Sequence, residues 1–157
     1  MERTPKERRW SSAATSRKAF HLILYVEDNE DIRQAYAIFL RRSGFRVAEA
    51  SDGLEGVERA IELQPDLVLM DLHLPKLDGY EATRRIKQHP RTCHVPVIAV
   101  SAHHYDVPGP GEEGLGCDGF LAKPMDGAEV VRHVIEVLAA SHKSAVAQSQ
   151  SNPRGQS

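Results

Sequence analysis

The stretch "DLVLMDLHLPKLDGY", residues 66–80, places a carboxylate at the end of a strongly apolar run. Residues 67–70 read Leu-Val-Leu-Met, a pattern typical of a β-strand that is buried on both faces. Asp71 follows directly, and burying a carboxylate is unfavourable unless the group is paired or used in chemistry. The sequence therefore indicates a functional group at the end of a central strand.

The segments on both sides of this strand alternate between further strands and amphipathic helices. The predicted strands lie at 22–26, 45–50, 95–101 and 119–122, and the predicted helices at 31–43, 52–64, 79–88 and 128–140. Such an alternation implies a parallel sheet that is covered by helices on both faces. We therefore predict the α/β class, with a flavodoxin-like doubly wound parallel sheet of five strands in the order 2-1-3-4-5.

The helix expected at 52–64 is defined by its ends and by its apolar face. Ser51 is the expected N-cap, and a proline follows the last helical residue. Leu54, Val57 and Ile61 recur at helical spacing. These three side chains are therefore expected to face the core.

The segment between the fourth and fifth strands departs from the alternation. It reads "HHYDVPGPGEEGLGCDG", residues 103–119, and holds prolines and glycines where a helix is due. An interior proline costs a helix about 3 kcal/mol and a glycine about 1 kcal/mol, so the fourth helix is expected to be short or replaced by a loop. The "GPGEEG" at 109–114 matches a dinucleotide-binding pattern, but it lies far from the strand end and its glutamates would face the pyrophosphate. We do not assign it that role.

Composition and charge limit the classes of function. Hydrophobic residues make up 41% and charged residues 27%, as in soluble globular domains, and no apolar run is long enough to cross a bilayer. Residues 1–19 carry a net charge of +4 and residues 141–157 a net charge of +2. Residues 20–140 therefore carry a net charge of −8, and an acidic domain of this kind argues against a broad nucleic-acid surface. We expect a basic, disordered N-terminal tail at 1–19, a folded domain at 20–140 and a disordered C-terminal tail at 141–157.

Polar residues follow four of the five predicted strands. Glu27 and Asp28 follow the first, Asp71 follows the third, Ser101 ends the fourth and Lys123 follows the fifth. The carboxyl ends of parallel strands meet at one edge of a sheet, so these side chains are expected to converge. Three clustered carboxylates require a cation, and hard oxygen ligands favour Mg²⁺. An aspartate acceptor, a metal, an ammonium group and a hydroxyl are the parts that phosphoryl transfer needs.

Four segments in this order resemble the receiver domain of two-component response regulators. They are "LYVEDNED", "DLVLMDLHLPKLDGYE", "VIAVSAH" and "GFLAKPMD", and the resemblance extends over residues 22–140. It implies that Asp71 accepts a phosphoryl group from a phosphohistidine. It also implies that the carboxylates of Glu27, Asp28 and Asp71 hold Mg²⁺ together with the backbone carbonyl of His73.

The resemblance also assigns roles to residues around the acceptor. Ser101 and Lys123 are expected to contact the phosphoryl oxygens, and Ser101 is expected to move inward when the group arrives. Phe120 stands where relatives carry an aromatic side chain that rotates inward behind that hydroxyl. The peptide bond between Lys123 and Pro124 is expected to be cis, as in relatives.

Two histidines occupy positions that control the access of water in relatives. His73 lies two residues beyond Asp71, and His103 lies two residues beyond Ser101. Imidazoles at these positions could orient water or titrate near neutral pH, so we hypothesise that they tune the lifetime of the acyl phosphate. The alternative is that both are solvent-facing loop histidines.

The other assignments have simpler alternatives as well. Asp71 could be a helix cap or part of a structural ion pair, and the acidic pair at 27–28 could cap the first helix. Ser101 could be an ordinary hydroxyl at a strand end, and Lys123 an ordinary surface lysine. Phe120 could stay in the core in every state, because it lacks a hydroxyl.

The resemblance implies a signalling role carried out through protein contacts. The expected partners are a sensor histidine kinase or a histidine phosphotransfer protein, together with a downstream protein target. No output domain is expected after residue 140, and we expect a cytoplasmic monomer or weak dimer with no direct nucleic-acid binding and no membrane insertion. The chain would catalyse only its own phosphoryl transfer and autodephosphorylation, so it is not expected to be an enzyme in the wider sense.

Two other functions stay open from the sequence. A receiver-like module could bind partners without phosphorylation, although such degenerate domains usually lose the acceptor, an acidic residue or the lysine, and all are present here. An aspartyl-phosphate phosphatase resembling the haloacid dehalogenases would carry a second acid two residues beyond the acceptor. His73 stands at that position.

Overall fold

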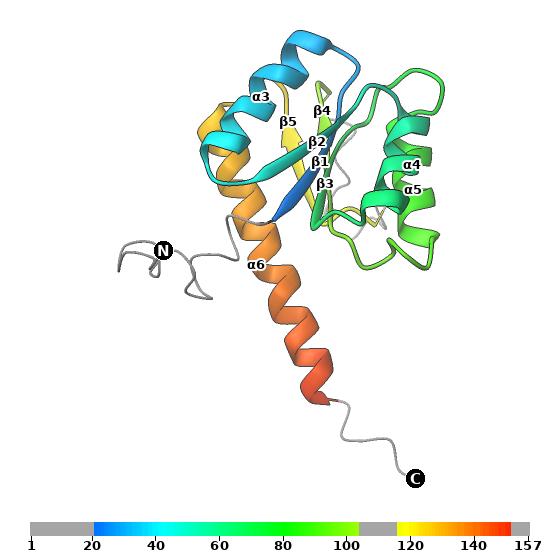
Figure 1. The fold of residues 1–157 in the computed structure, drawn as a ribbon, viewed down its shortest axis with the longest axis vertical. Helices are drawn as coiled ribbons and strands as arrows, with labels where there is room; N and C mark the ends of the chain where they lie inside the picture. The colour runs from blue at the N-terminus through cyan, green and yellow to red at the C-terminus, as the bar shows by residue number, and fades with distance from the viewer. Residues whose placement is uncertain (1–20, 104–115, 152–157) are drawn as a thin grey trace, which may run out of the picture.

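The computed structural model describes residues 21–103 and 116–151, which form one sheet covered by helices (Figure 1). The sheet has five parallel strands in the order β2-β1-β3-β4-β5. These strands are β1 (Leu22–Val26), β2 (Arg46–Ala50), β3 (Leu67–Asp71), β4 (Val97–Ser101) and β5 (Gly119–Ala122). The predicted class, strand direction and strand order are confirmed.

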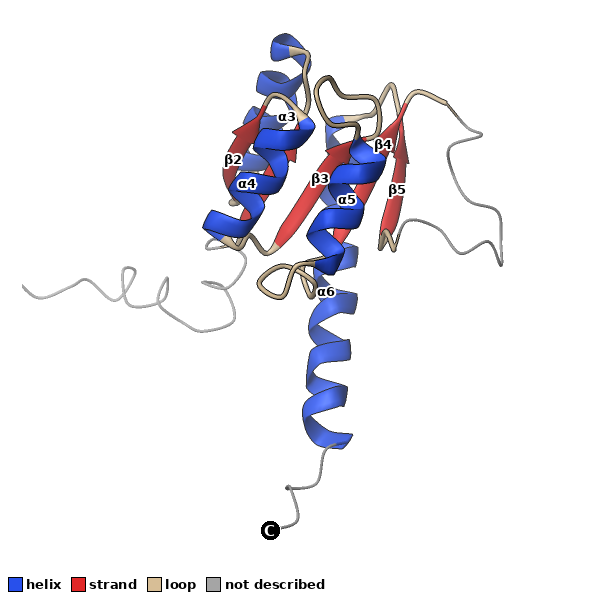
Figure 2. Cartoon of the chain, turned by 90° about the vertical axis from the view of Figure 1, so that its right-hand side faces the viewer, coloured by secondary structure: helices blue, strands red, loops and turns tan. Residues whose placement is uncertain are grey.

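Helices cover both faces of this sheet. In the described residues they are α3 (Glu30–Arg42), α4 (Gly53–Leu63), α5 (Gly79–Gln88) and α6 (Gly127–Ser151). Figures 1 and 2 show α3 and α6 on one face and α4 and α5 on the other. The fold is therefore doubly wound, as predicted.

Each face of the sheet buries its own apolar core, because successive strand residues point in opposite directions. In β1, Ile23 and Tyr25 belong to the core beneath α3 and α6, whereas Leu24 and Val26 belong to the core beneath α4 and α5. All five residues of β3 are buried. This burial on both faces explains the continuous apolar run that precedes Asp71, and it fixes the register in which the strand ends lie side by side.

Three of the helices begin at a side-chain cap. Asn29, Asp52 and Asp78 each accept a hydrogen bond from a backbone N–H three residues further on. The predicted cap of α4 is therefore wrong by one residue. The Asp52 carboxylate accepts from the backbone N–H of Glu55 at 2.8 Å, whereas the Ser51 hydroxyl donates to the Glu55 carboxylate. A carboxylate at this position also interacts favourably with the positive end of the helix dipole.

The buried face of α4 is also rotated relative to the prediction. Val57 and Ile61 pack against the core as expected, but Leu54 is 43% exposed. Gly56 lies instead on the side of α4 that is nearest to the sheet, where a Cβ would come within 2.9 Å of the Val26 side chain. The helix is so close to the sheet that a small residue is needed there, and this turns Leu54 toward solvent.

Helix α6 is longer than predicted. It continues past Ala140 to Ser151 and projects beyond the edge of the sheet (Figures 1 and 2). The prediction of a disordered tail at 141–157 is therefore wrong as far as Ser151. The physical reason is that nothing in residues 141–151 stops the helix: two alanines, two glutamines and a lysine favour it, no glycine occurs there, and the first proline is Pro153.

Several predictions concern residues outside the described parts of the chain. They are the basic tail at 1–19, the last residues at 152–157, and the loop in place of a fourth helix, which falls mainly on residues 104–115. Among the described helices, none combines the length and the apolar character that a membrane span requires.

Candidate functional site

The carboxyl edge of the sheet gathers the polar residues that follow the strands. Glu27 and Asp28 come directly after β1, and Asp71 is the last residue of β3. Ser101 ends β4, and Lys123 comes directly after β5. Because all the strands are parallel, these residues emerge at the same edge. The predicted convergence is observed.

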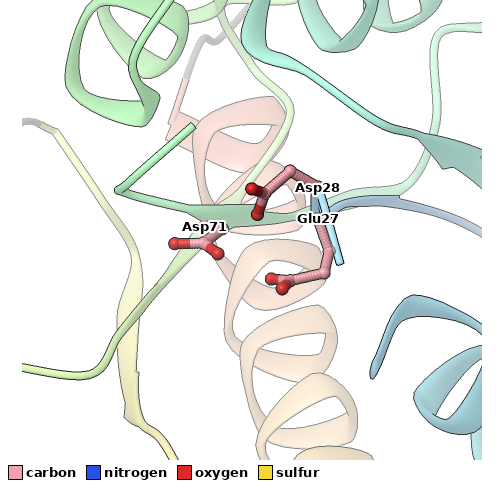
Figure 3. Close-up of side chains that lie close together, drawn as sticks. All are labelled: Glu27, Asp28 and Asp71. Carbon is pink, nitrogen blue, oxygen red and sulfur yellow. The ribbon is translucent and has the colours of Figure 1, made fainter. Parts of the chain in front are cut away.

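Three carboxylates form a tight group at this edge (Figure 3). One oxygen from each of Glu27, Asp28 and Asp71 lies within 4.8 Å of the others. Glu27 and Asp71 are only 1% and 3% exposed, whereas Asp28 is open to solvent. In the part of the chain that the structure describes, no other set of His, Cys, Asp or Glu side chains comes together in this way. A group of oxygen donors alone, partly open to water, fits a hard divalent cation such as Mg²⁺.

The acidic pair after β1 is not explained by helix capping. Asn29 caps α3, and its side chain accepts a hydrogen bond from the backbone N–H of Ile32 at 3.0 Å. The backbone carbonyl of Glu27 is held separately by the Arg33 guanidinium at 2.8 Å. The carboxylates of Glu27 and Asp28 are therefore left for the site.

Lys123 joins the two buried carboxylates. Its Nζ donates to Glu27 Oε2 at 2.8 Å and to Asp71 Oδ2 at 2.7 Å. The lysine side chain is only 20% exposed, so it is not an ordinary surface lysine. Its backbone N–H donates to the carbonyl of Ser101, and the peptide bond to Pro124 is cis, as predicted. One ammonium group therefore compensates two carboxylates that are out of reach of bulk water.

Burial changes the pKa values within this group. Burial, and then the neighbouring Asp71, raise the pKa of Glu27 to about 7 even though Lys123 acts in the other direction. Burial alone would lower the pKa of Lys123, but its hydrogen bonds with Asp71 and Glu27 outweigh this effect and raise it. Without a second cation, the folded protein therefore tends to hold a proton on Glu27 near neutral pH.

The affinity for Mg²⁺ is expected to fall as the pH is lowered from 8 to 6. A dication favours the ionised form of Glu27, so below pH 7 its binding must displace a proton, and the affinity should fall by up to about tenfold per pH unit. Calorimetric titration with Mg²⁺ in buffers of different ionisation enthalpy measures both the affinity and the number of protons released. A Glu27→Gln variant should bind more weakly and release no proton. An affinity that stays constant over this range would contradict the prediction.

The same raised pKa sets the sign of the pH dependence of stability in the metal-free protein. Because the pKa of Glu27 is higher in the folded state than its ordinary value of 4.5, its contribution to stability is fully present below pH 4.5. That contribution is lost as the pH rises through about 7. Mg²⁺ is therefore expected to stabilise the protein more at pH 8 than at pH 6.

The loops after β3 and β4 orient the second carboxylate oxygen of Asp71 and the hydroxyl of Ser101. Asp71 Oδ1 accepts a hydrogen bond from the backbone N–H of His73 at 2.9 Å. Ser101 is 3% exposed, and its Oγ accepts from the backbone N–H of His103 at 3.1 Å. The two loops thus hold the carboxylate and the hydroxyl in fixed positions at the edge of the sheet.

The two histidines of these loops lie against each other. The rings of His73 and His103 are 5.1 Å apart between centroids and nearly perpendicular, and His73 also meets the ring of Tyr80 at 6.4 Å. Both histidines are exposed to solvent. The sequence places each one near the site, but their mutual contact depends on the path of two loops and could not be read from it.

Phe120 is half-buried and belongs to neither apolar core. Its neighbour Leu121 faces the core beneath α6, so the phenylalanine points to the other face of β5. This placement disagrees with the alternative of a permanently buried core side chain. Its predicted part in switching stays a prediction.

Gly79 shapes the site and was not identified from the sequence as a functional residue. It begins α5, and a Cβ there would come within 1.9 Å of the backbone carbonyl oxygen of Asp71. The backbone N–H of Gly79 donates to the carbonyl of Leu72 at 3.0 Å, which fixes the loop after β3. The signal was available in the "LDGY" of residues 77–80, where a glycine begins a helix directly after its cap.

A Gly79→Ala substitution is expected to destabilise the fold by about 3 kcal/mol or slightly more. The added methyl would overlap backbone atoms that cannot rotate away, so either α5 or the end of β3 must shift. Urea unfolding monitored by circular dichroism measures the loss, with Gln88→Ala as a control, because Gln88 lies exposed at the end of the same helix. Equal stability of Gly79→Ala and the wild type would show that the loop is not packed as described.

Comparisons with known proteins place this chain in a family. The family model for the response regulator receiver domain matches residues 23–135, and the chain belongs to this family. The polar-differentiation response regulator DivK of Brucella anthropi is 36% identical over 106 residues, which cover 66% of this chain and 84% of DivK. The DNA-binding dual master transcriptional regulator RpaA of Synechocystis is 34% identical over 116 residues, or 74% of this chain and 48% of RpaA. The chain thus spans about half the length of RpaA and of similar full-length regulators.

Solved structures agree with this assignment. The receiver domain of the sensor histidine kinase PA1611 from Pseudomonas aeruginosa has a TM-score of 0.68 and 36% identity, and the match covers 76% of this chain and 98% of that domain. That crystal structure has a magnesium ion coordinated in the active site cleft. The chemotaxis response regulator CheY4 of Vibrio cholerae also has a TM-score of 0.68, at 22% identity over 75% of this chain and 98% of CheY4, and supports the fold.

Proposed function

We propose that this receiver domain is a phosphorylation-activated switch in which Asp71 accepts a phosphoryl group from the phosphohistidine of a sensor histidine kinase or a histidine phosphotransfer protein. The observation that carries the proposal is the position of Asp71. Its carboxylate lies at the end of a buried strand, grouped with Glu27 and Asp28 and bonded to Lys123. Membership of the receiver family supports the same role.

The transfer exchanges one bond to phosphorus for another. A carboxylate oxygen of Asp71 forms a bond to the phosphorus atom as the bond from phosphorus to the histidine nitrogen breaks, and the electron pair returns to the imidazole. The backbone N–H of His73 and the Nζ of Lys123 hold the two oxygens of Asp71 and so orient the nucleophile. Lys123 also places positive charge where negative charge gathers on the phosphoryl oxygens.

The residues present fit a Mg²⁺ ion in this site. Glu27, Asp28 and Asp71 would hold it, with the backbone carbonyl of His73 as a further oxygen ligand. The ion would supply charge neutralisation for the phosphoryl oxygens. The magnesium-bound receiver of PA1611 supports this assignment.

Ser101 is proposed to couple the phosphoryl group to the rest of the domain. In the unmodified protein its hydroxyl accepts from the backbone of its own loop, through the N–H of His103. Movement toward a phosphoryl oxygen would break this bond and draw the loop after β4 with it. Phe120, which lies half-buried on the neighbouring strand, would then rotate into the space behind the hydroxyl.

His73 and His103 are proposed to tune the lifetime of the acyl phosphate by limiting the access of water. Their contact supports a joint action. Replacing both with alanine should speed hydrolysis about threefold or more, because water then reaches the phosphoryl group without hindrance. The decay of phosphoprotein after removal of the donor measures the rate, with His133→Ala on α6 as a control. Unchanged decay in the double variant would remove both residues from the mechanism.

The wider role follows from the same chemistry. We propose that the domain acts in the cytoplasm through contacts with its phosphodonor and with a downstream protein. Its catalysis would be limited to its own phosphorylation and dephosphorylation. The family membership and the composition of the site support a regulator rather than a metabolic enzyme.

The direct test is the incubation of the chain with acetyl phosphate. In the presence of Mg²⁺ the intact mass should increase by one phosphoryl group, and the gain should disappear when EDTA replaces the metal. If no gain occurs with Mg²⁺, the domain is a binding module that works without phosphorylation. Continuous release of inorganic phosphate from many small phosphate esters would favour a phosphatase instead.

A further inference from the structure

The Tyr25 hydroxyl is buried without a hydrogen-bond partner. Tyr25 is the fourth of the five residues of β1, with 0% of its surface exposed, and in the described parts of the chain nothing accepts or donates a hydrogen bond at its oxygen. A buried polar group in this state costs folding free energy, and a phenylalanine would fill the same space without that cost. Such an exception to normal hydrogen bonding calls for an explanation.

The Tyr25 side chain leaves the sheet one layer below the carboxylates. Glu27 directly follows β1, two residues after Tyr25, and its backbone N–H still donates to the carbonyl of Ala50 on β2 at 3.0 Å, so the two side chains leave the chain on the same face. The neighbouring strand repeats this arrangement, since Tyr25 pairs with Leu69 and Asp71 comes two residues later. Burial, and then the charges of Glu27 and Asp71, raise the pKa of Tyr25. A phenol is neutral near pH 7 whatever its surroundings, and its O–H can donate to an ionised carboxylate.

The ring of Tyr25 is held beside the segment that carries the lysine. It meets the ring of Tyr36 edge-on, with centroids 6.3 Å apart. The Tyr36 hydroxyl is fully bonded: it donates to the carbonyl of Met125 and accepts from its backbone N–H at 3.2 Å. Met125 lies two residues beyond Lys123. The aromatic pair thus supports the base of the site, but only one of its two hydroxyls is used in the unmodified protein.

Phosphorylation would change which groups donate hydrogen bonds to the carboxylates of Glu27 and Asp71. Lys123 now serves both Glu27 and Asp71, and under the proposed function it turns to the phosphoryl oxygens on Asp71. A metal ion would hold one oxygen of Glu27, but Oε2, which Lys123 leaves, would lose its donor without gaining water, because Glu27 is 1% exposed. We propose that the Tyr25 hydroxyl is a reserve donor that bonds to Glu27 in the phosphorylated state. Tyr25 is thus a positioning residue, and this inference rests on the proposed function of Asp71.

The test compares Tyr25→Phe with Thr83→Val. Thr83 carries another buried hydroxyl without a partner, but it lies on α5 in the core on the other face of the sheet. Tyr25→Phe removes a hydroxyl and Thr83→Val replaces one with a methyl group of similar size, so neither should lower the free energy of unfolding of the unmodified protein. With Mg²⁺ present, the affinity for beryllofluoride, a phosphoryl mimic, should fall about tenfold in Tyr25→Phe, the value of one hydrogen bond to a charged group, and stay unchanged in Thr83→Val.

A spectroscopic measurement follows the hydroxyl itself. In protein labelled with ¹³C at tyrosine Cζ, the signal that Tyr25→Phe removes should shift when beryllofluoride is added to the wild type. An equal affinity of Tyr25→Phe and the wild type, a signal that does not shift, or a loss of stability in unmodified Tyr25→Phe would each overturn the inference. A wild type that does not bind beryllofluoride would instead overturn the proposed function, so the two failures are distinguishable.

Discussion

An Asp71→Asn variant is expected to accept no phosphoryl group while keeping the fold. Asparagine has the size of aspartate, and its side-chain oxygen can still accept the hydrogen bond from the backbone N–H of His73. The amide lacks the charged oxygen that would attack phosphorus, so the rate should fall by at least about a hundredfold. Lys123 keeps its bond to Glu27, and the site loses one of two negative charges that share this lysine. The free energy of unfolding should therefore not decrease.

Intact mass after incubation with acetyl phosphate and Mg²⁺ measures this effect. Asp66→Asn is a matched control, because Asp66 precedes the same strand at its other end and serves a structural role, accepting from the backbone N–H of Leu22 at 2.7 Å. The control should gain one phosphoryl group as the wild type does. A gain that persists in Asp71→Asn would assign the acceptor to another residue and remove the basis of the proposed switch.

The fold could be predicted because burial on both faces leaves a simple pattern. The run before Asp71 is apolar without alternation, and such runs recur between amphipathic helices, which only a covered parallel sheet explains. The details that failed depend on close packing or on the local chain. Leu54 is exposed because α4 approaches the sheet at Gly56. Helix α6 continues past Ala140 because its sequence favours a helix, whereas the prediction weighed only the absence of large apolar residues.

The sequence was sufficient to predict which residues come together in the site. Parallel strands bring their carboxyl ends together, so Glu27, Asp28, Asp71 and Lys123 had to converge once the topology was assigned. The proton on Glu27 could not be predicted, since it depends on how deeply the carboxylate is buried and on how one lysine is shared. The closeness of Gly79 to the backbone of Asp71 likewise depends on a loop path that no periodicity encodes.

The Lys123→Met variant separates the electrostatic role of this residue from its packing. Methionine keeps most of the unbranched side chain but removes the ammonium group, which leaves Glu27 and Asp71 as neighbouring buried carboxylates without a counter-charge. We expect a loss of about 3 kcal/mol in the free energy of unfolding at pH 8 without metal. The loss should be smaller at pH 6. Without Lys123 the pKa of Glu27 rises further above its value of about 7, so Glu27 is protonated at that pH and the repulsion disappears.

Urea unfolding at both pH values, with and without Mg²⁺, checks this expectation. Mg²⁺ should restore most of the lost stability at pH 8, because a dication compensates the same carboxylates that the lysine compensated. Lys87→Met is a suitable control: Lys87 is similarly exposed and pairs with Asp118 at 2.7 Å, but among the described residues no carboxylate cluster surrounds it. Mg²⁺ should therefore not restore the stability that the Lys87→Met variant loses. If Lys123→Met were as stable as the wild type in metal-free buffer at pH 8, the carboxylates would not depend on Lys123, and its place in the phosphoryl site would have to rest on other grounds.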